Sequence, residues 1–252
     1  EHGIEVTEHI LEDECTRLNE VFFHYIQTKR PFVVMKYAMT LDGKIATYTG
    51  ASKWVTGEQA RNHVQEQRHR YTGIMVGVGT VLADDPLLTC RKAGCKNPIR
   101  IICDTDLRTP LTAQVVTTAK QAPTILVTCS VDREKWTGYE EAGCRILPAE
   151  RKNGRIDLER LMERLGQEGL DSILLEGGGT LNWAALESGI VQKVQAYIAP
   201  KLFGGQTAKT PVEGAGVPSP GCAFQLKNMV ITQLGEDILL ESEVASHVHR
   251  DC

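Results

Sequence analysis

Two oppositely charged residues stand in otherwise apolar runs, and they are the first candidates for chemistry. Lys36 is the one charge in residues 32–39, and Glu176 ends the apolar run that begins at Ser172. A charged group among core residues is costly unless an opposite charge pairs with it. Each residue is therefore expected either at a solvent-facing edge or at a site. Their place beside glycine turns predicts an active-site rim, and a structural ion pair is the competing interpretation.

Three glycine-containing turns follow expected strands. They span residues 76–80 (Val-Gly-Val-Gly-Thr), 176–182 (Glu-Gly-Gly-Gly-Thr-Leu-Asn) and 201–205 (Lys-Leu-Phe-Gly-Gly). Glycine after a strand lets backbone N–H groups approach a phosphate, and a following helix points its positive end at the anion. Two such turns in one α/β domain therefore suit a dinucleotide. The first two turns lack the Rossmann spacing, and glycines used only for tight turns are the alternative.

Three arginines form the next group of candidates. Arg61 and Arg68 are seven residues apart, so they lie on one face of an expected helix, and Arg91 follows the loop that contains Pro86. The planar fork of arginine can donate two parallel hydrogen bonds to a phosphate. Taken alone, the three are equally consistent with solvated surface side chains.

Alternating strands and helices are expected from Phe32 onward, and they must position these residues. Several strands are continuous apolar runs, which is typical of strands covered on both faces. The expected strands are residues 32–38, 73–78, 99–104, 123–128, 144–147, 172–176 and 194–199. A capping box of Thr56 and Gln59 predicts a helix that runs toward Tyr71. Further helices are expected at residues 132–142, 157–168 and 180–188.

The two ends of the sequence complete the expected fold. Residues 3–6 are expected to form a short strand, followed by one helix that ends before Pro31. Residues 224–234 and 237–244 are two β runs with the spacing of a hairpin. The order of elements predicts an α/β fold with a mixed sheet flanked by helices. The apolar residues 229–234 suit pairing across a twofold axis, so a homo-oligomer is also expected.

Composition and missing motifs argue against several classes of function. The 252 residues carry 28 Lys+Arg and 32 Asp+Glu, a net charge of −4, so nucleic acid and anionic membrane are not expected partners. No apolar run reaches the ~18 residues that cross a bilayer and no signal peptide is recognised, which predicts a cytoplasmic protein. The sequence holds no CxxC, HExxH or His-x-Glu, so no metal site is expected. His247, His249 and Cys252 are expected to lie in a frayed tail.

Four long strings carry a resemblance to a known family. They are VVMKYAMTLDGKIATYTGASKWVTGEQAR at residues 33–61, GIMVGVGTVLADDPLLTCR at 73–91, LLEGGGTLNWAAL at 174–186 and YIAPKLFGG at 197–205. In this order they resemble the reductase domain of the bacterial bifunctional riboflavin-biosynthesis deaminase/reductase. Residues 1–29 resemble the tail of its deaminase domain. The resemblance implies a reductase domain at residues 30–246, followed by a C-terminal tail at 247–252.

This resemblance implies a dihydrofolate reductase-like fold and an NADPH-dependent oxidoreductase of riboflavin biosynthesis. The reaction would reduce the ribosyl group of 5-amino-6-(5-phosphoribosylamino)uracil to the ribityl product. Lys36 and Glu176 would be catalytic, with Lys36 close to the carbon that receives hydride, and Thr105 would lie near the 2′-phosphate of the cofactor. The positions implied for the cofactor are Ala38, Trp54, Thr80, Asp84, Thr105, Gly178, Gly179, Thr180, Leu181 and Asn182. Those implied for the substrate are Ser52, Arg68, Leu88, Arg91 and Glu176.

The residues and the resemblance together predict a mechanism. Arg68 and Arg91 would clamp the 5′-phosphate, and hydride would pass from the nicotinamide C4 to C1′ of the ring-opened sugar. Lys36 would assist ring opening or protonation, with Glu176 orienting it. The deaminase signature, a His-x-Glu followed by Pro-Cys-x-x-Cys, is absent, so neither deamination nor catalytic zinc is expected. The alternatives are a same-fold reductase acting on the diaminopyrimidine before deamination, dihydrofolate reductase itself, and a non-catalytic nucleotide-binding module.

Overall fold

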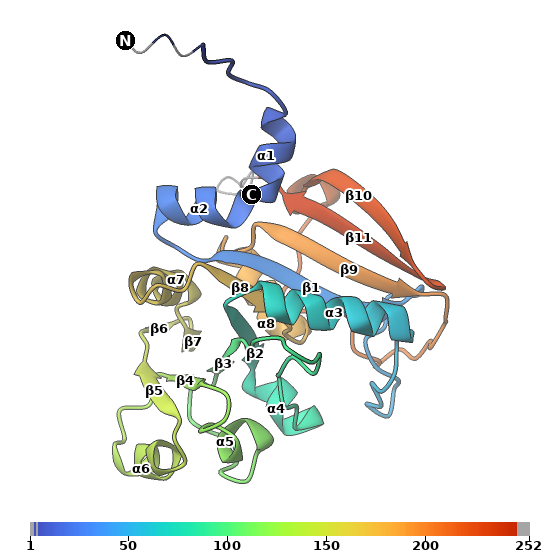
Figure 1. Cartoon of the computed structure of the whole chain (residues 1–252). Helices are drawn as coiled ribbons and strands as arrows, with labels where there is room; N and C mark the ends of the chain where they lie inside the picture. The colour runs from blue at the N-terminus through green and yellow to red at the C-terminus, as the bar shows by residue number, and fades with distance from the viewer. Residues whose placement is uncertain (1–2, 4, 246–252) are drawn as a thin grey trace.

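A mixed sheet of nine strands forms the centre of the computed structural model, which describes residue 3 and residues 5–245 (Figure 1). The strands lie in the order β10-β11-β9-β1-β8-β2-β3-β4-β5. From β9 to β5 every neighbouring pair is parallel, whereas β10, β11 and β9 pair antiparallel. The predicted mixed α/β sheet is therefore confirmed. The bounds are β1 Phe32–Thr40, β2 Gly73–Gly77, β3 Ile99–Cys103, β4 Thr124–Thr128, β5 Arg145–Pro148, β8 Ser172–Leu175, β9 Lys193–Ala199, β10 Leu226–Leu234 and β11 Asp237–Val244.

Strand β1 shows why several of the parallel strands are mostly apolar. Val33 and Val34 point to opposite faces of the sheet, yet neither side chain is exposed. Val33 and Met35 pack among residues of two helices on one face, while Phe32 and Val34 pack with Tyr71 on the other. Strand β1 is thus covered on both faces, which is the condition that the continuous apolar runs predict.

The helices divide between the two faces of the sheet (Figure 1). Helices α3 (Glu58–Arg70), α4 (Val78–Asp84), α5 (Gln114–Thr117) and α6 (Glu134–Glu141) cover one face. Helices α7 (Leu158–Gln167) and α8 (Gly179–Glu187) cover the other, and a small hairpin of β6 (Arg151–Lys152) and β7 (Arg155–Ile156) precedes α7. The carboxylate of Asp157 caps α7 by accepting hydrogen bonds from the backbone N–H groups of Glu159 and Arg160.

The N-terminal segment differs from its prediction in two respects. The described residues among 3–6 form no strand, so that prediction is wrong for Gly3, Glu5 and Val6. The single expected helix is two helices, α1 (Glu12–Leu18) and α2 (Glu20–Thr28), which join at Asn19. Helix α2 is held against α7, because the Tyr25 hydroxyl donates to the Gly166 carbonyl at 2.8 Å and Arg30 pairs with Glu163 at 2.5 Å.

The capping box predicted at Thr56 and Gln59 does not form. Helix α3 begins after Gly57, and no side chain of its own caps it. Instead, Asp237 from the start of β11 accepts a hydrogen bond from the Gly57 N–H at 2.7 Å. A carboxylate 180 residues away in the sequence therefore replaces the local cap.

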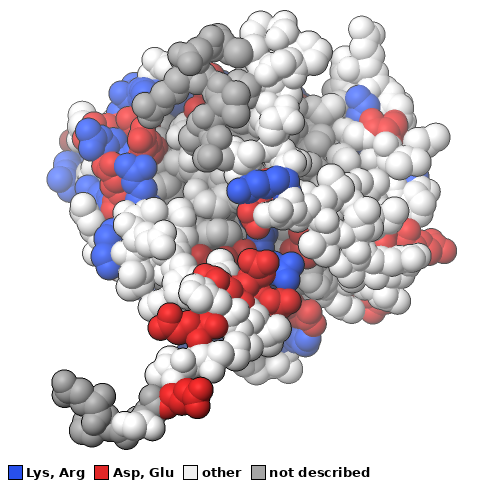
Figure 2. All heavy atoms as spheres, turned by 90° about the horizontal axis from the view of Figure 1, so that it is seen from above, with Lys and Arg blue, Asp and Glu red and all other residues white. Residues whose placement is uncertain are grey.

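The C-terminal hairpin is confirmed, with β10 at the open edge of the sheet (Figure 1). Its apolar side chains Met229, Val230 and Ile231 are exposed. Figure 2 shows a face on which acidic side chains gather near the N-terminal helices and charges of both signs interleave at the left. In the part of the chain that the structure describes, no helix has the length and apolarity to span a membrane. The tail residues His247, His249 and Cys252 lie outside the described residues.

Candidate active site

A pocket of about 1140 Å³ opens where β1, β2, β3 and β8 end at their carboxyl edge. Loops from both sides of the sheet complete its wall, including residues 45–56, 83–91 and 176–181. Of the predicted site residues, fifteen line the pocket: Lys36, Ala38, Ser52, Trp54, Arg68, Thr80, Asp84, Leu88, Arg91, Thr105, Glu176, Gly178, Gly179, Thr180 and Leu181. Asn182 does not line it; its side chain is fully buried and donates to the carbonyl of Pro211.

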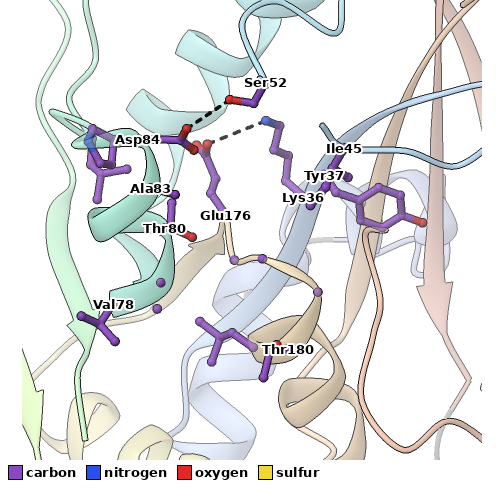
Figure 3. A pocket seen from close by; sticks show the side chains of 18 of the residues that line it. Lys36, Tyr37, Ile45, Ser52, Val78, Thr80, Ala83, Asp84, Glu176 and Thr180 are labelled. Atoms are coloured by element: carbon purple, nitrogen blue, oxygen red, sulfur yellow. Dashed lines mark hydrogen bonds and ion pairs between the residues drawn. The ribbon is translucent and has the colours of Figure 1, made fainter. Parts of the chain in front are cut away.

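Lys36, Glu176 and Arg68 form the charged centre of the pocket. The Lys36 ammonium lies 3.7 Å from Glu176 Oε2, and Figure 3 shows the two side chains pointing toward each other. Arg68 from α3 binds Glu176 with both prongs, Nε to Oε1 at 2.7 Å and Nη2 to Oε2 at 2.9 Å. All three side chains are at most 14% exposed. The two charges singled out in the sequence therefore meet, and the arginine makes their group net positive.

Burial and charge act in opposite directions on these groups. Burial alone would raise the pKa of Glu176, but Arg68 and Lys36 outweigh burial and hold this pKa at about 2. For Lys36, burial lowers the pKa below its ordinary value, although Glu176 acts to raise it. Glu176 is thus an anion at neutral pH, and the Lys36 ammonium gives up its proton more readily than an exposed lysine.

The two glycine turns lie against each other beneath this centre. A Cβ on Gly178 would lie 4.0 Å from the Thr80 hydroxyl, and one on Gly77 would lie 3.6 Å from Leu181. Neither α4 nor α8 has a side-chain cap, so the first N–H groups of both helices remain available to an anion. At Gly179 a Cβ would stand 2.7 Å from the Thr210 carbonyl, so only glycine fits at this turn.

Two loops form the wall beside the charged centre. Ser52, from the loop between β1 and α3, donates to Asp84 Oδ1 at 3.1 Å and so reaches across to α4 (Figure 3). Asp42, from the same loop, accepts hydrogen bonds from Thr40 and from the N–H groups of Phe203 and Gly204. The hydrogen bond from Thr40 is the largest of the influences that lower the pKa of Asp42 to about 2. The third glycine turn is therefore fixed to this loop by a carboxylate.

Three polar side chains hold the loop of residues 85–91. Arg68 Nη1 donates to the Thr89 carbonyl at 3.1 Å, and Gln65 Oε1 accepts from the Arg91 N–H at 2.8 Å. Arg100 has no exposed surface and donates to the Leu87 carbonyl at 3.1 Å. In the part of the chain that the structure describes, the guanidinium of Arg91 enters no ion pair, so the loop presents an available cation to the pocket.

Comparison with known proteins assigns the family. Residues 31–240 match the family described as RibD C-terminal domain. The chain belongs to this family. The riboflavin biosynthesis protein RibD of Actinobacillus pleuropneumoniae is 54% identical over 244 residues, which are 97% of this chain and 65% of that protein. The chain thus spans just under two thirds of the length of that relative, and the resemblance read from the sequence is confirmed.

Two further proteins resemble this chain over 85% and 97% of its length. A 2,5-diamino-6-ribosylamino-4(3H)-pyrimidinone 5′-phosphate reductase of Methanothermobacter thermautotrophicus is 39% identical, covering 85% of this chain and 99% of that protein. The structure of a diaminohydroxyphosphoribosylaminopyrimidine deaminase/5-amino-6-(5-phosphoribosylamino)uracil reductase from Thermotoga maritima has a TM-score of 0.77 at 32% identity. That match covers 97% of this chain and 65% of the Thermotoga chain.

The fold also brings residues to the pocket that no sequence motif indicated. Arg108 and Arg155 belong to none of the sequence motifs, yet both line the pocket together with Thr105. Arg155 lies on β7, a two-residue strand too short for periodicity to reveal. Gln65 was missed because it stands in a polar helix, and only contact with the Arg91 loop distinguishes it from its neighbours.

Proposed function

We propose that this protein uses NADPH to reduce the ribosyl group of 5-amino-6-(5-phosphoribosylamino)uracil to the ribityl group. The observation that carries the proposal is the place of the Lys36–Glu176–Arg68 group between the glycine turns and the loop that bears Arg91. A sugar phosphate in this space would have its phosphate near Arg91 and its reacting carbon near Lys36. The names of the relatives support the same reaction class.

The residues of the pocket fit NADPH at its two phosphate-bearing parts. The uncapped start of α8, with Gly178 and Gly179, suits the pyrophosphate. Thr105, Arg108 and Arg155 suit the 2′-phosphate of the adenosine. When bound, NADPH would supply the hydride that reduces the sugar carbon.

The contacts of Arg68 support different roles for Arg68 and Arg91, the two predicted phosphate ligands. Its Nε and Nη2 already donate to Glu176, and its Nη1 donates to the Thr89 carbonyl. We therefore assign the substrate phosphate chiefly to Arg91, and we assign Arg68 to holding Glu176 and the loop. Lys36 supplies a proton at the sugar as its ring opens, and the Glu176 carboxylate balances the charge of the ammonium.

An NADPH-oxidation assay with the purified chain tests the proposal. We expect turnover with 5-amino-6-(5-phosphoribosylamino)uracil, weaker turnover with its dephosphorylated form, and none with dihydrofolate, which carries no phosphate for Arg91. Product analysis must find the ribityl group. If reduced nucleotide is not consumed with any phosphorylated ribosylaminopyrimidine, the proposed function is wrong.

A second substrate is favoured by one observation. The Methanothermobacter reductase, whose name specifies the diaminopyrimidinone, matches this chain over 99% of its own length. The same site could therefore accept 2,5-diamino-6-ribosylamino-4(3H)-pyrimidinone 5′-phosphate before deamination. The ratio of kcat/KM for the two pyrimidines decides between the substrates, because both share the sugar phosphate and differ only in the ring.

A further inference from the structure

A polar cluster of buried and partly buried side chains lies near Lys36, on the face of the sheet that α3 covers. Its members are Tyr197 and Gln195 of β9, His63 and Gln67 of α3, and Glu241 of β11. None of them lines the pocket. Tyr197 is 1% exposed, and the Lys36 ammonium lies 5.6 Å from the centre of its ring. The cluster thus reaches the proposed catalytic lysine through the ring of Tyr197, which does not line the pocket.

Hydrogen bonds join the cluster into a chain whose direction can be deduced. A carboxylate only accepts, so Gln195 must turn its Nε2 toward Glu241 Oε1, 2.9 Å away. The same Nε2 lies 3.1 Å from Gln67 Oε1, which therefore also accepts. The amide nitrogen of Gln67 then faces His63 Nε2 at 3.2 Å and donates to it.

This direction fixes the tautomer of His63. Because Nε2 accepts from Gln67, the ring proton of a neutral imidazole sits on Nδ1. That Nδ1–H donates to the Tyr197 hydroxyl oxygen, 2.8 Å away. The ring of Tyr197 is therefore held at its hydroxyl end by a chain anchored at Glu241.

Lys36 needs such support, because its carboxylate partner does not fix it. The distance of 3.7 Å to Glu176 Oε2 is an ion pair but longer than a hydrogen bond, and both Glu176 oxygens are already bound by Arg68. An aromatic face attracts an ammonium most strongly where water is excluded. The Tyr197 ring supplies that attraction to a side chain that is 13% exposed.

We propose that Tyr197 is a positioning residue for Lys36, and that the Glu241–Gln195–Gln67–His63 chain sets the orientation of its ring. This inference rests on the proposed function, in which Lys36 acts at the sugar. The ring holds the ammonium at the pocket and favours its protonated form. The charged or titratable groups that face Lys36 and Tyr197 are Glu176 from the end of β8, Arg68, His63 and Glu66 from α3, Tyr71 after α3, and Glu241 from β11.

The first test compares Tyr197→Leu, which removes the ring, with Tyr197→Phe, which keeps it. The readout is the titration of the Lys36 side chain, followed by NMR with ¹³C-labelled lysine and assigned with Lys36→Arg. We expect the Lys36 pKa to fall by roughly 0.5–1 unit in Tyr197→Leu and to change little in Tyr197→Phe. Equal titration curves in the wild type and in Tyr197→Leu would overturn the proposal. This measurement needs no substrate, so its outcome is independent of the proposed function.

Kinetics give the second readout. We expect Tyr197→Leu to lower kcat about tenfold, to leave the KM for NADPH within about twofold, and to move the alkaline limb of the kcat profile to lower pH. Tyr197→Phe should restore most of kcat and the wild-type limb. Identical losses in both variants would show a merely structural role. A wild-type protein without reductase activity would defeat the proposed function but not the NMR result.

The wild-type protein itself supplies a measurement if the ring-free variant does not fold. Nitrogen chemical shifts distinguish the two neutral tautomers of histidine. We expect the neutral imidazole of His63 to carry its proton on Nδ1. A proton on Nε2 would break the deduced chain and overturn its role in orienting Tyr197.

Discussion

At the scale of single residues, the site is built on a charge arrangement that would be unfavourable without each of its members. Glu176 neutralises one of two buried cations, and its oxygens are both bound by Arg68. The second cation, Lys36, is left with a weaker hold and a lowered pKa. A buried ammonium that is loosely paired and easily deprotonated is suited to giving up a proton, whereas a tightly bound one would be suited only to structure.

Lys36→Ala tests that distinction. We expect kcat to fall by ~10²-fold or more, because the proton donor is lost, while NADPH binding stays nearly unchanged. Turnover and the dissociation constant for NADPH are both measured, with Lys96→Ala, an exposed lysine, as the matched control. Wild-type turnover in Lys36→Ala would remove this residue from the chemistry.

The low pKa of Glu176 leads to a prediction about how the stability of the fold depends on pH. Its pKa in the folded protein is about 2, below the ordinary 4.5, so its contribution to stability is present above pH 4.5 and is lost as the pH falls toward 2. Glu176→Gln should remove this dependence and destabilise the fold at neutral pH by about 3–5 kcal/mol, since two buried cations lose their anion. Urea denaturation between pH 7 and pH 3 measures both effects. Glu140→Gln, which changes an exposed carboxylate, should leave the profile unaltered.

At the scale of elements, helix α3 contributes more contacts to the site than the sequence predicted. It carries Arg68 to Glu176, His63 to Tyr197 and Gln65 to the Arg91 loop. The spacing of Arg61 and Arg68 did indicate a shared helix face, but Arg61 Nη1 donates to the Thr56 carbonyl at 2.7 Å and stacks on Trp54 instead. Helical periodicity places residues on a face without saying which of them will meet another element.

The variant Gln65→Leu tests how α3 holds the loop of residues 85–91. The variant leaves the Arg91 N–H without its acceptor and frees the loop, and one such hydrogen bond corresponds to about tenfold in binding. We expect the KM for the pyrimidine phosphate to rise about tenfold while the KM for NADPH is unchanged. Asn62→Ala, an exposed residue on the same helix, is the control. An equal rise in both KM values would indicate general damage to α3 rather than loss of the loop contact.

The same scale shows what the sequence could predict and what it could not. The seven parallel strands were predictable because most of them are buried, mainly apolar runs, and all are found within two residues of their expected bounds. The cap of α3 was not predictable, because it is supplied by Asp237, which lies 180 residues from Gly57 in the sequence. Helix α5 and strands β6 and β7 are four residues or fewer, which is too short for any period to be read. Local sequence patterns therefore predicted the long strands, while contacts between residues far apart in the sequence determined how α3 is capped.

At the scale of the whole molecule, the site forms because several strands that are far apart in the sequence end at the same edge of the sheet. Lys36 and Glu176 are 140 residues apart in the chain, yet they meet because β1 and β8 are parallel neighbours whose carboxyl ends share one edge. The glycine turns after β2 and β8 meet for the same reason. The sequence indicated these partners one at a time, and the order of strands in the sheet brings them together.

Two arginines that line the pocket lead to a prediction about the choice between NADPH and NADH. Arg108 follows β3 and Arg155 lies on β7, and both are exposed cations beside Thr105. Within the described ranges 3 and 5–245, neither enters an ion pair, so both are available to a 2′-phosphate. Replacing both by alanine should raise the KM for NADPH by roughly 10–100-fold and leave the KM for NADH within about twofold. Steady-state kinetics with the two nucleotides measure the ratio, and Arg160→Ala, which changes an exposed arginine of α7, should preserve it. A parallel loss with both nucleotides would place the effect on the pyrophosphate or the fold and would contradict a role of these arginines in selecting NADPH.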